Sequence, residues 1–78
     1  MDDLVHKIRP MVEALVFKSV GVDDQLYSSH LIDSMGTVEL ALLLEEEFDI
    51  KIDTRDITEV NFDSVAKLAS YIRKRLNE

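Results

Sequence analysis

Residues 31–40 read Leu31-Ile32-Asp33-Ser34-Met35-Gly36-Thr37-Val38-Glu39-Leu40, and this stretch decides the fold. It indicates a loop that ends in a serine at the start of a helix, which we expect over residues 34–47. At about 100° per residue, the apolar residues of this helix fall on two separate sides. The first side is the expected core face, and it contains Thr37, Leu40, Ala41, Leu44 and Phe48.

The second apolar side is a narrower stripe formed by Met35, Val38 and Leu42. An apolar stripe with an acidic rim is typical of a small protein-binding surface. Burial beneath the last helix or the long loop would explain the same three residues, so both interpretations stay open here. The acids that flank the stripe are Glu39, Glu45, Glu46 and Asp49.

The end of this helix conflicts with local helix physics. Glu45, Glu46 and Glu47 stand in the last turn, where the helix dipole disfavours each negative charge by roughly 0.3–1 kcal/mol. Features that oppose stability without visible compensation are candidates for function. We therefore predict that acids of this helix pair with Arg or Lys on partner proteins.

The chain has 78 residues, of which 46% are hydrophobic, and it contains no cysteine. These values predict one small domain over residues 1–78 with a packed core and no disulfide, thiolate nucleophile or cysteine-bound metal. No apolar run approaches the about 20 residues of a membrane span, and no basic and apolar leader opens the chain. We expect a monomeric cytoplasmic protein without a membrane span.

The net charge of −7 is unevenly distributed. Residues 23–63 contain twelve acids against Lys51 and Arg55, whereas residues 64–78 contain four bases and one acid. The acidic middle disfavours nucleic-acid binding, which needs a basic footprint, and suits a partner with a basic surface. Solubility alone could also explain an acidic surface.

Helical periodicity before and after the central stretch completes the expected fold. Apolar residues at three- and four-residue spacing predict a first helix from Leu4 to Val16, kinked at Pro10 and closed by a left-handed Gly21. Residues 18–33 should form a long loop pinned to the core by Val22, Leu26, Leu31 and Ile32.

The C-terminal third should contain one very short helix and one longer helix. Asp53 or Thr54 can cap a short helix over 55–59, after which Val60 and Phe62 should enter the core. Asp63 or Ser64 should then cap a last helix. The predicted fold is all-α: a small four-helix bundle of three main helices and a short third helix, with a long loop between the first two. The buried stripe of the last helix should be Val65, Leu68, Ala69, Ile72 and Leu76.

Ser34 admits three interpretations. A serine or aspartate before a helix is commonly a simple N-cap. A nucleophilic serine would need a base and an oxyanion site, and neither His6 nor His30 stands in a nucleophile motif. His30 also lacks a second ligand at metal-binding spacing. A hydroxyl at an exposed helix start is open to modification by another enzyme, and the positive helix end favours an attached phosphate. Gly36 would let that enzyme approach closely.

These residues resemble the acyl carrier protein family. The resemblance lies in Asp33-Ser34-Met35 with Val38-Glu39-Leu40 beyond it, then Glu46-Glu47-Phe48-Asp49, and in length, acidity and helix order over essentially the whole chain. It implies a non-catalytic carrier whose serine, here Ser34, covalently bears 4′-phosphopantetheine with an acyl or aminoacyl group held as a thioester.

The resemblance also implies three kinds of partner. They are a phosphopantetheinyl transferase, an adenylate-forming ligase or acyltransferase that loads the arm, and a downstream acceptor enzyme. Gly36 stands where fatty-acid carriers usually have an acid. The motif is most similar to discrete aminoacyl or acyl carriers of D-alanyl-type and natural-product pathways. The alternative is a small acidic helical adaptor without a prosthetic group. The implied partner contacts are Asp33, Met35, Val38, Glu39, Leu42, Glu45 and Glu46.

Overall fold

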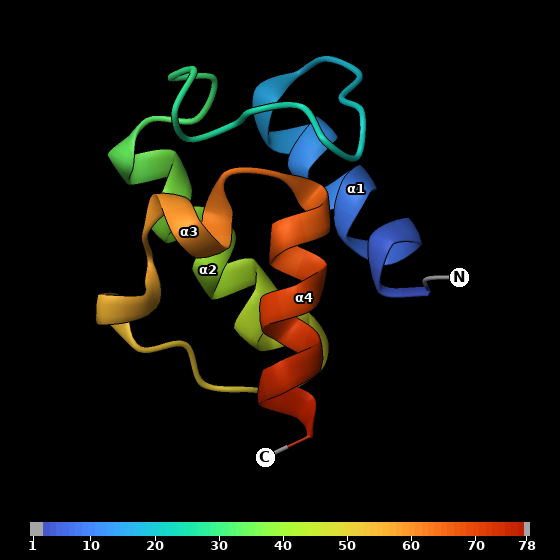
Figure 1. The fold of residues 1–78 in the computed structure, drawn as a ribbon, viewed down its shortest axis with the longest axis vertical. Coiled ribbons are helices and arrows are strands. Elements are labelled where there is room, and N and C mark those ends of the chain that lie inside the picture. Colours follow the sequence, from blue (N-terminus) through green and yellow to red (C-terminus); the bar gives the residue numbers. More distant parts are fainter. Residues whose placement is uncertain (1–2, 78) are drawn as a thin grey trace.

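A computed structural model of the chain describes residues 3–77, and within this range the regular structure is entirely helical. The expected all-α fold is confirmed (Figure 1). A long loop arches from the end of the first helix to the start of the second. The elements are α1 (Asp3–Val16), α2 (Ser34–Phe48), the 3-10 turn η1 (Thr54–Asp56), α3 (Glu59–Phe62) and α4 (Val65–Leu76).

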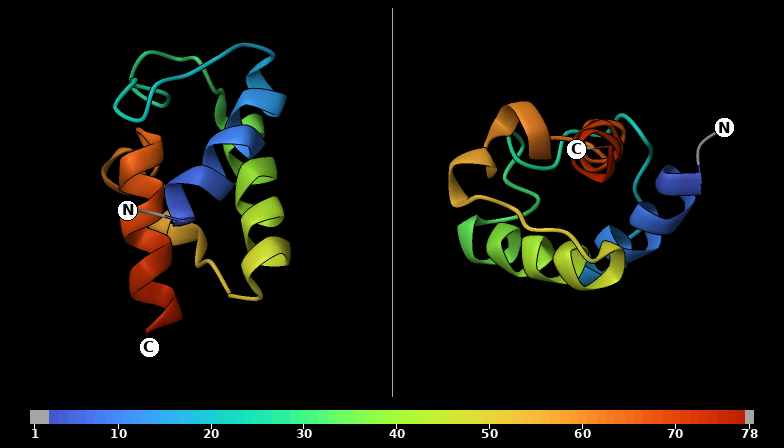
Figure 2. Two further views of the ribbon diagram at one scale, coloured as in Figure 1. Left: turned by 90° about the vertical axis from the view of Figure 1, so that its right-hand side faces the viewer. Right: turned by 90° about the horizontal axis from the view of Figure 1, so that it is seen from below.

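The helices surround one core, with α2 and α4 on opposite sides and α1 and α3 beside them (Figure 2). Each long helix contributes most of the stripe that its periodicity predicts, because apolar residues three and four positions apart share one face. On α2 the expected core face is confirmed, with Phe48 partly buried and the other four residues buried. The largest fully buried side chains are Phe62, Ile8, Leu26, Leu40, Leu44, Leu68, Ile72, Val12 and Val65.

The first helix continues through Pro10 as one element, so the proline does not break it. The prediction that Gly21 closes this helix is wrong. Phe17 adopts the left-handed conformation at φ 59°, and its N–H donates to the Glu13 carbonyl oxygen at 2.8 Å. The Glu13 carboxylate also accepts a hydrogen bond from Val20 N at 2.9 Å. These contacts turn the chain directly after α1, four residues before the glycine.

The long loop is anchored to the core by three of the four predicted residues, with Leu31 partly buried and Val22 outside the core cluster. Leu26 and Ile32 are buried, and Val20 is buried as well. The Asp63 carboxylate, itself buried, accepts hydrogen bonds from Tyr27 N at 2.9 Å and Ser28 N at 2.8 Å. Backbone donors and the Ser28 hydroxyl thereby hold the pKa of Asp63 below its usual range, despite burial.

The connection between α2 and α4 departs from the prediction. The expected helix over 55–59 is two separate pieces, η1 with Asp53 as its cap and then α3. Phe62 is buried as predicted, but Val60 is 76% exposed and does not enter the core. A helix as short as α3 can turn one apolar residue inward while its neighbour faces solvent.

The last helix begins as predicted and differs from the prediction at two apolar positions. Ser64 is its N-cap, with its hydroxyl accepting from Lys67 N at 3.1 Å. Leu76 is exposed, which corrects the predicted stripe, because the core ends before the last turn. Tyr71 is buried instead, and its hydroxyl donates to Asp56 Oδ2 at 2.7 Å.

Candidate functional site

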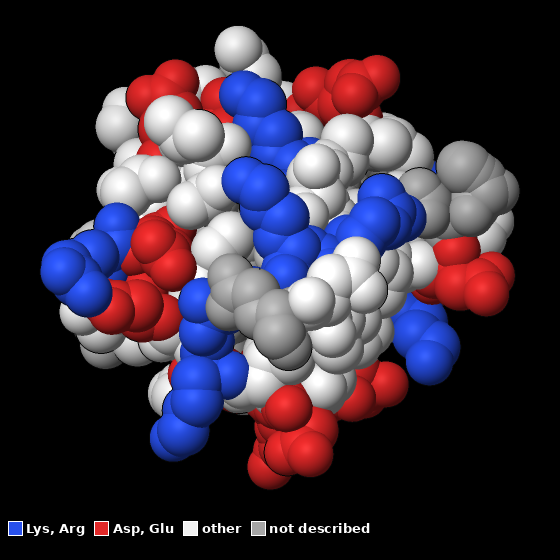
Figure 3. Space-filling view, turned by 60° about the horizontal axis from the view of Figure 1, so that its bottom comes forward, with Lys and Arg blue, Asp and Glu red and all other residues white. Residues whose placement is uncertain are grey.

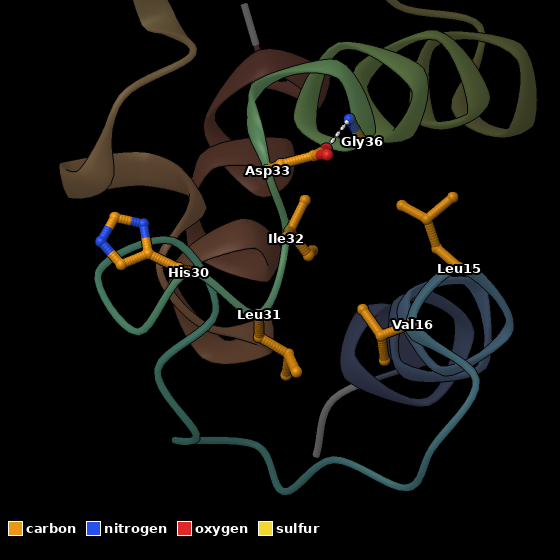
Figure 4. A pocket seen from close by; sticks show the side chains of 7 residues that line it. All are labelled: Leu15, Val16, His30, Leu31, Ile32, Asp33 and Gly36. Atoms are coloured by element: carbon orange, nitrogen blue, oxygen red, sulfur yellow. Dashed lines mark hydrogen bonds between the residues drawn. The ribbon is translucent and has the colours of Figure 1, made fainter.

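Asp33 fixes the start of α2. Its Oδ1 accepts a hydrogen bond from Gly36 N at 2.7 Å (Figure 4), and its carbonyl oxygen accepts from Thr37 N at 2.9 Å. The buried Thr37 hydroxyl donates to the same carbonyl at 2.8 Å. Asp33, rather than Ser34, is therefore the N-cap, so the cap interpretation does not account for the serine.

Ser34 is the first residue of α2, and it is exposed. No residue between 3 and 77 forms a hydrogen bond with its side chain, and neither histidine is bonded to it. The first N–H groups of a helix have no intrahelical acceptor. Asp33 accepts from the N–H groups of Gly36 and Thr37, which leaves those of Ser34 and Met35 for an incoming anion. An exposed hydroxyl beside free N–H groups at a positive helix end fits a phosphodiester.

The structure gives a second reason for glycine at position 36, besides the close approach of an enzyme that was expected from the sequence. A Cβ atom at this position would lie 3.1 Å from Asp33 Oδ1 and 3.1 Å from Ile32 Cγ2. These distances are shorter than ordinary van der Waals contacts. The absence of a side chain therefore lets the Asp33 carboxylate reach the Gly36 N–H, whatever approaches from outside.

The second apolar stripe of α2 lies on the surface. Met35 is 80% exposed, Val38 49% and Leu42 60%, so the interpretation that other elements bury these residues is wrong. Leu43, for which no expectation followed from the sequence, is also exposed, and so is Val60, which was expected in the core. Large exposed apolar side chains that share one helix face are typical of an interaction surface.

The acids beside this stripe do not behave alike. Glu39 and Glu46 are exposed. Glu45 is partly buried, and its Oε2 accepts a hydrogen bond from Ile52 N at 2.6 Å. This hydrogen bond offsets the unfavourable interaction of the Glu45 charge with the helix dipole, and the sequence did not reveal it. Asp49 ends α2 in a left-handed conformation, with its N–H bonded to the Glu45 carbonyl.

A hollow of about 240 Å³ lies behind the start of α2. In Figure 4, Leu15 and Val16 of α1 face Ile32 and Leu31 of the loop, and Asp33 and Gly36 lie at one end. His30 is exposed, and its ring is directed away from α1 in this view. Among residues 3–77, no group of histidine, cysteine or acidic side chains could hold a metal ion.

Charge is segregated on the surface. Figure 3 shows Lys and Arg side chains in a band across the middle of one face, with acidic side chains toward its edges. Three bases, Arg73, Lys74 and Arg75, occupy the last turn of α4, where the helix dipole favours positive charge. In contrast, α2, all of which is described, has no basic residue in its last turn.

The fold and the site together define a class: a small helical domain that presents one exposed serine at the head of its second helix. The chain belongs to the phosphopantetheine attachment site family, whose family model matches residues 13–72. The prosthetic group of this family is 4′-phosphopantetheine, as the resemblance implied. Among the helices of residues 3–77, none has the length and hydrophobicity of a membrane span.

Curated relatives refine this assignment. The chain is 33% identical over 60 residues to a D-alanyl carrier protein of Lactobacillus delbrueckii subsp. bulgaricus, which covers 77% of this chain and 75% of the relative. It is 27% identical over 77 residues to D-alanyl carrier proteins of Streptococcus sanguinis and Streptococcus mutans, covering 96% of this chain and 98% of each relative. The chain is therefore a carrier protein.

Proposed function

We propose that Ser34 bears the phosphopantetheine arm and that the chain delivers an aminoacyl or acyl group between enzymes of a dedicated pathway. The observation that carries this proposal is the exposed Ser34 hydroxyl at the first residue of α2, beside the exposed stripe of Met35, Val38 and Leu42. Family membership supports it, because the matched residues 13–72 include this serine. The chain would be a substrate of its partner enzymes and not a catalyst.

The residues around Ser34 have distinct roles in this proposal. Asp33 holds the helix start, so that the serine has a fixed position and its hydroxyl is open to a transferase. When bound, the arm supplies a terminal thiol that holds the cargo as a thioester. Covalent tethering gives the cargo a high local concentration at each enzyme that the carrier visits.

Partner enzymes would bind the α2 surface and must release it again. A small contact steered by charge suits such alternating recognition, since rim charges act mainly on the association rate. The proposed partners are a phosphopantetheinyl transferase, a loading ligase or acyltransferase, and an acceptor enzyme, each with a basic surface. The proposed contact residues are Asp33, Met35, Val38, Glu39, Leu42, Glu45 and Glu46, with one oxygen of Glu45 already bonded to Ile52.

The proposed cargo is an aminoacyl group, of which D-alanyl is the first to test. The names of the relatives support it, because each of those proteins is called a D-alanyl carrier protein. Incubation with a D-alanine-activating ligase and ATP should load the holo protein. The thioester should be released by neutral hydroxylamine, which cleaves thioesters but leaves amides intact.

Intact mass spectrometry tests the attachment residue. After incubation with coenzyme A and a broad phosphopantetheinyl transferase, the protein should gain the mass of one phosphopantetheine. Ser34→Ala should abolish the gain. Ser70→Ala is the matched control, because Ser70 is also an exposed serine on a helix, and it should leave the gain unchanged. An unmodified wild-type protein would instead favour the adaptor that uses the same α2 surface without a prosthetic group.

A further inference from the structure

A groove of about 410 Å³ lies at the C-terminal end of α2, at the opposite end of the helix from Ser34. Three apolar side chains line it, and two of them, Leu42 and Leu43, are exposed. Its charged lining is predominantly acidic. The lining residues are Leu42, Leu43, Glu45, Glu46, Asp49, Ile50 and Lys51.

A row of side chains leads from Ser34 toward this groove, and it winds partly round α2 because each four-residue step turns it by about 40°. Ser34, Val38, Leu42 and Glu46 are each four residues apart, so they form one ridge along the helix surface. All four are exposed, and the two central ones are apolar. At 1.5 Å rise per residue, Leu42 lies about 12 Å and Glu46 about 18 Å from Ser34 along the helix axis.

The phosphopantetheine arm is long enough to pass Leu42, at the near edge of the groove, but it ends before Glu46. Fourteen bonds separate the serine oxygen from the terminal sulfur, which corresponds to roughly five extended residues, or about 16 Å. Its dimethyl and methylene segments can lie against Val38 and Leu42. The thioester would then stand at the mouth of the groove, and the cargo beyond it would enter.

The charge of the groove selects the kind of cargo. The C-terminal end of a helix carries partial negative charge, and no base in the last turn of α2 neutralises it. Glu46 and Asp49 add two exposed carboxylates, whereas Lys51 is the single base among the lining residues. A cation is therefore favoured here. The α-amino group of an aminoacyl thioester is such a cation, and a plain acyl group has none.

We propose that an aminoacyl group on the Ser34 arm rests in this groove, with its ammonium beside Glu46 and Asp49 and its side chain against Leu42 and Leu43. This inference rests on the proposed function, because it needs the arm on Ser34. An uncharged acyl group of the same size would spend less time there. The carrier thereby distinguishes aminoacyl from acyl cargo by where it holds each one.

NMR of two matched loaded forms tests this inference. Starting from alanyl- and propionyl-coenzyme A analogues in which NH replaces the thioester sulfur, the transferase attaches the acylated arm to the ¹⁵N-labelled protein and releases adenosine 3′,5′-bisphosphate. The spectra are recorded at pH 6.5. The analogues differ in their ammonium group and are similar in size. The alanyl form should shift the backbone amide resonances of residues 42–51 more than the propionyl form does.

Variants then assign the effect to the two carboxylates. Glu46→Gln combined with Asp49→Asn should reduce the alanyl-specific shifts about two- to fivefold, the range expected for losing exposed charge pairs. Asparagine tolerates the left-handed backbone of Asp49, so α2 should remain intact. Glu59→Gln is the control, since Glu59 is an exposed acid on α3 that does not line the groove, and it should leave the shifts unchanged.

Two outcomes would overturn the inference in distinguishable ways. If both analogues attach at Ser34 but give equal shifts over residues 42–51, or shifts that the double variant does not change, the groove does not hold the ammonium. If neither analogue adds mass to the protein, or if both still attach to Ser34→Ala, the proposed attachment at Ser34 itself is wrong.

Discussion

Removal of the Asp63 carboxylate should destabilise the domain more than removal of any exposed acid. In Asp63→Ala, the N–H groups of Tyr27 and Ser28 lose their acceptor, and both belong to the partly buried segment that anchors the long loop. A buried donor left unsatisfied costs about 1–3 kcal/mol. Because both residues are only partly buried, water can satisfy these donors in part, and we expect a total loss of about 3 kcal/mol in the free energy of unfolding. Asp63→Asn retains one acceptor oxygen and should cost about 1 kcal/mol.

Urea unfolding followed by circular dichroism measures this loss. With a slope near 1 kcal/mol per M for a domain of this size, the midpoint of Asp63→Ala should fall by about 3 M. Asp23→Asn is the control, because Asp23 is exposed, and the urea midpoint of this variant should equal that of wild type. Hydrogen exchange should also accelerate at the amides of Tyr27 and Ser28, since these donors lose their protection.

The effect should depend on pH with a definite sign. The pKa of Asp63 is lowered in the folded state, so the unfolded chain binds the proton first as the pH falls. The contribution of this carboxylate is therefore complete above its unfolded pKa of about 3.9 and is lost as the pH falls through the folded value. The difference in free energy of unfolding between wild type and Asp63→Ala should therefore become smaller as the pH falls through that range. The reasoning would be refuted if the two proteins differed by less than about 1 kcal/mol in free energy of unfolding at pH 7, or if this difference stayed the same at low pH.

Three further perturbations give separate expectations. When Asp33 is also alanine, Gly36→Ala should stabilise the protein by less than the about 1 kcal/mol of helix propensity, because the added Cβ still crowds Ile32. With Asp33 present the gain should be smaller again, because the Cβ also crowds the capping carboxylate, and thermal unfolding of the four combinations measures this coupling. Burial raises the pKa of Tyr71 to about 12, with the Asp56 hydrogen bond adding to it, so its stabilising contribution holds up to about pH 10 and is lost toward pH 12. An ultraviolet titration should show one tyrosine ionisation with a pKa of about 12, which Tyr71→Phe should remove. If this ionisation remained in the variant, it would belong to a residue other than Tyr71. Glu39→Lys should lower kcat/KM with a basic transferase roughly three- to tenfold at low salt and less at high salt, whereas Glu59→Lys, with the same change in net charge, should not.

Much of the fold follows from local periodicity. The buried stripes of α1, α2 and α4 were predicted because a helix repeats every 3.6 residues and its apolar residues must share a face. The caps Asp53 and Ser64 were among the predicted residues, since short polar side chains bond the first N–H groups of a helix. Ser34 was singled out by its neighbours, and the structure places it at the head of α2.

The errors occur where a residue's environment depends on contacts that helical periodicity does not describe. Val60 is apolar yet exposed, because α3 is one turn long and offers the core a single side chain, Phe62. Gly21 seemed the natural helix terminator, but Glu13 makes the turn earlier through its bond to Val20. The chain accordingly places Phe17 in a left-handed conformation, 91% exposed, which no propensity would suggest.

The sequence by itself determined the helical class of fold, the place of Ser34 at the start of a helix and the two distinct apolar sides of α2, because each follows from the spacing of residues along a helix. Only the tertiary structure decided which of those sides is exposed to solvent. It also showed that Glu45 and Asp63 hold backbone donors from other segments, at Ile52 and at Tyr27 and Ser28. Burial and long-range hydrogen bonding depend on which surfaces the other helices cover, and spacing within one helix carries no information about that.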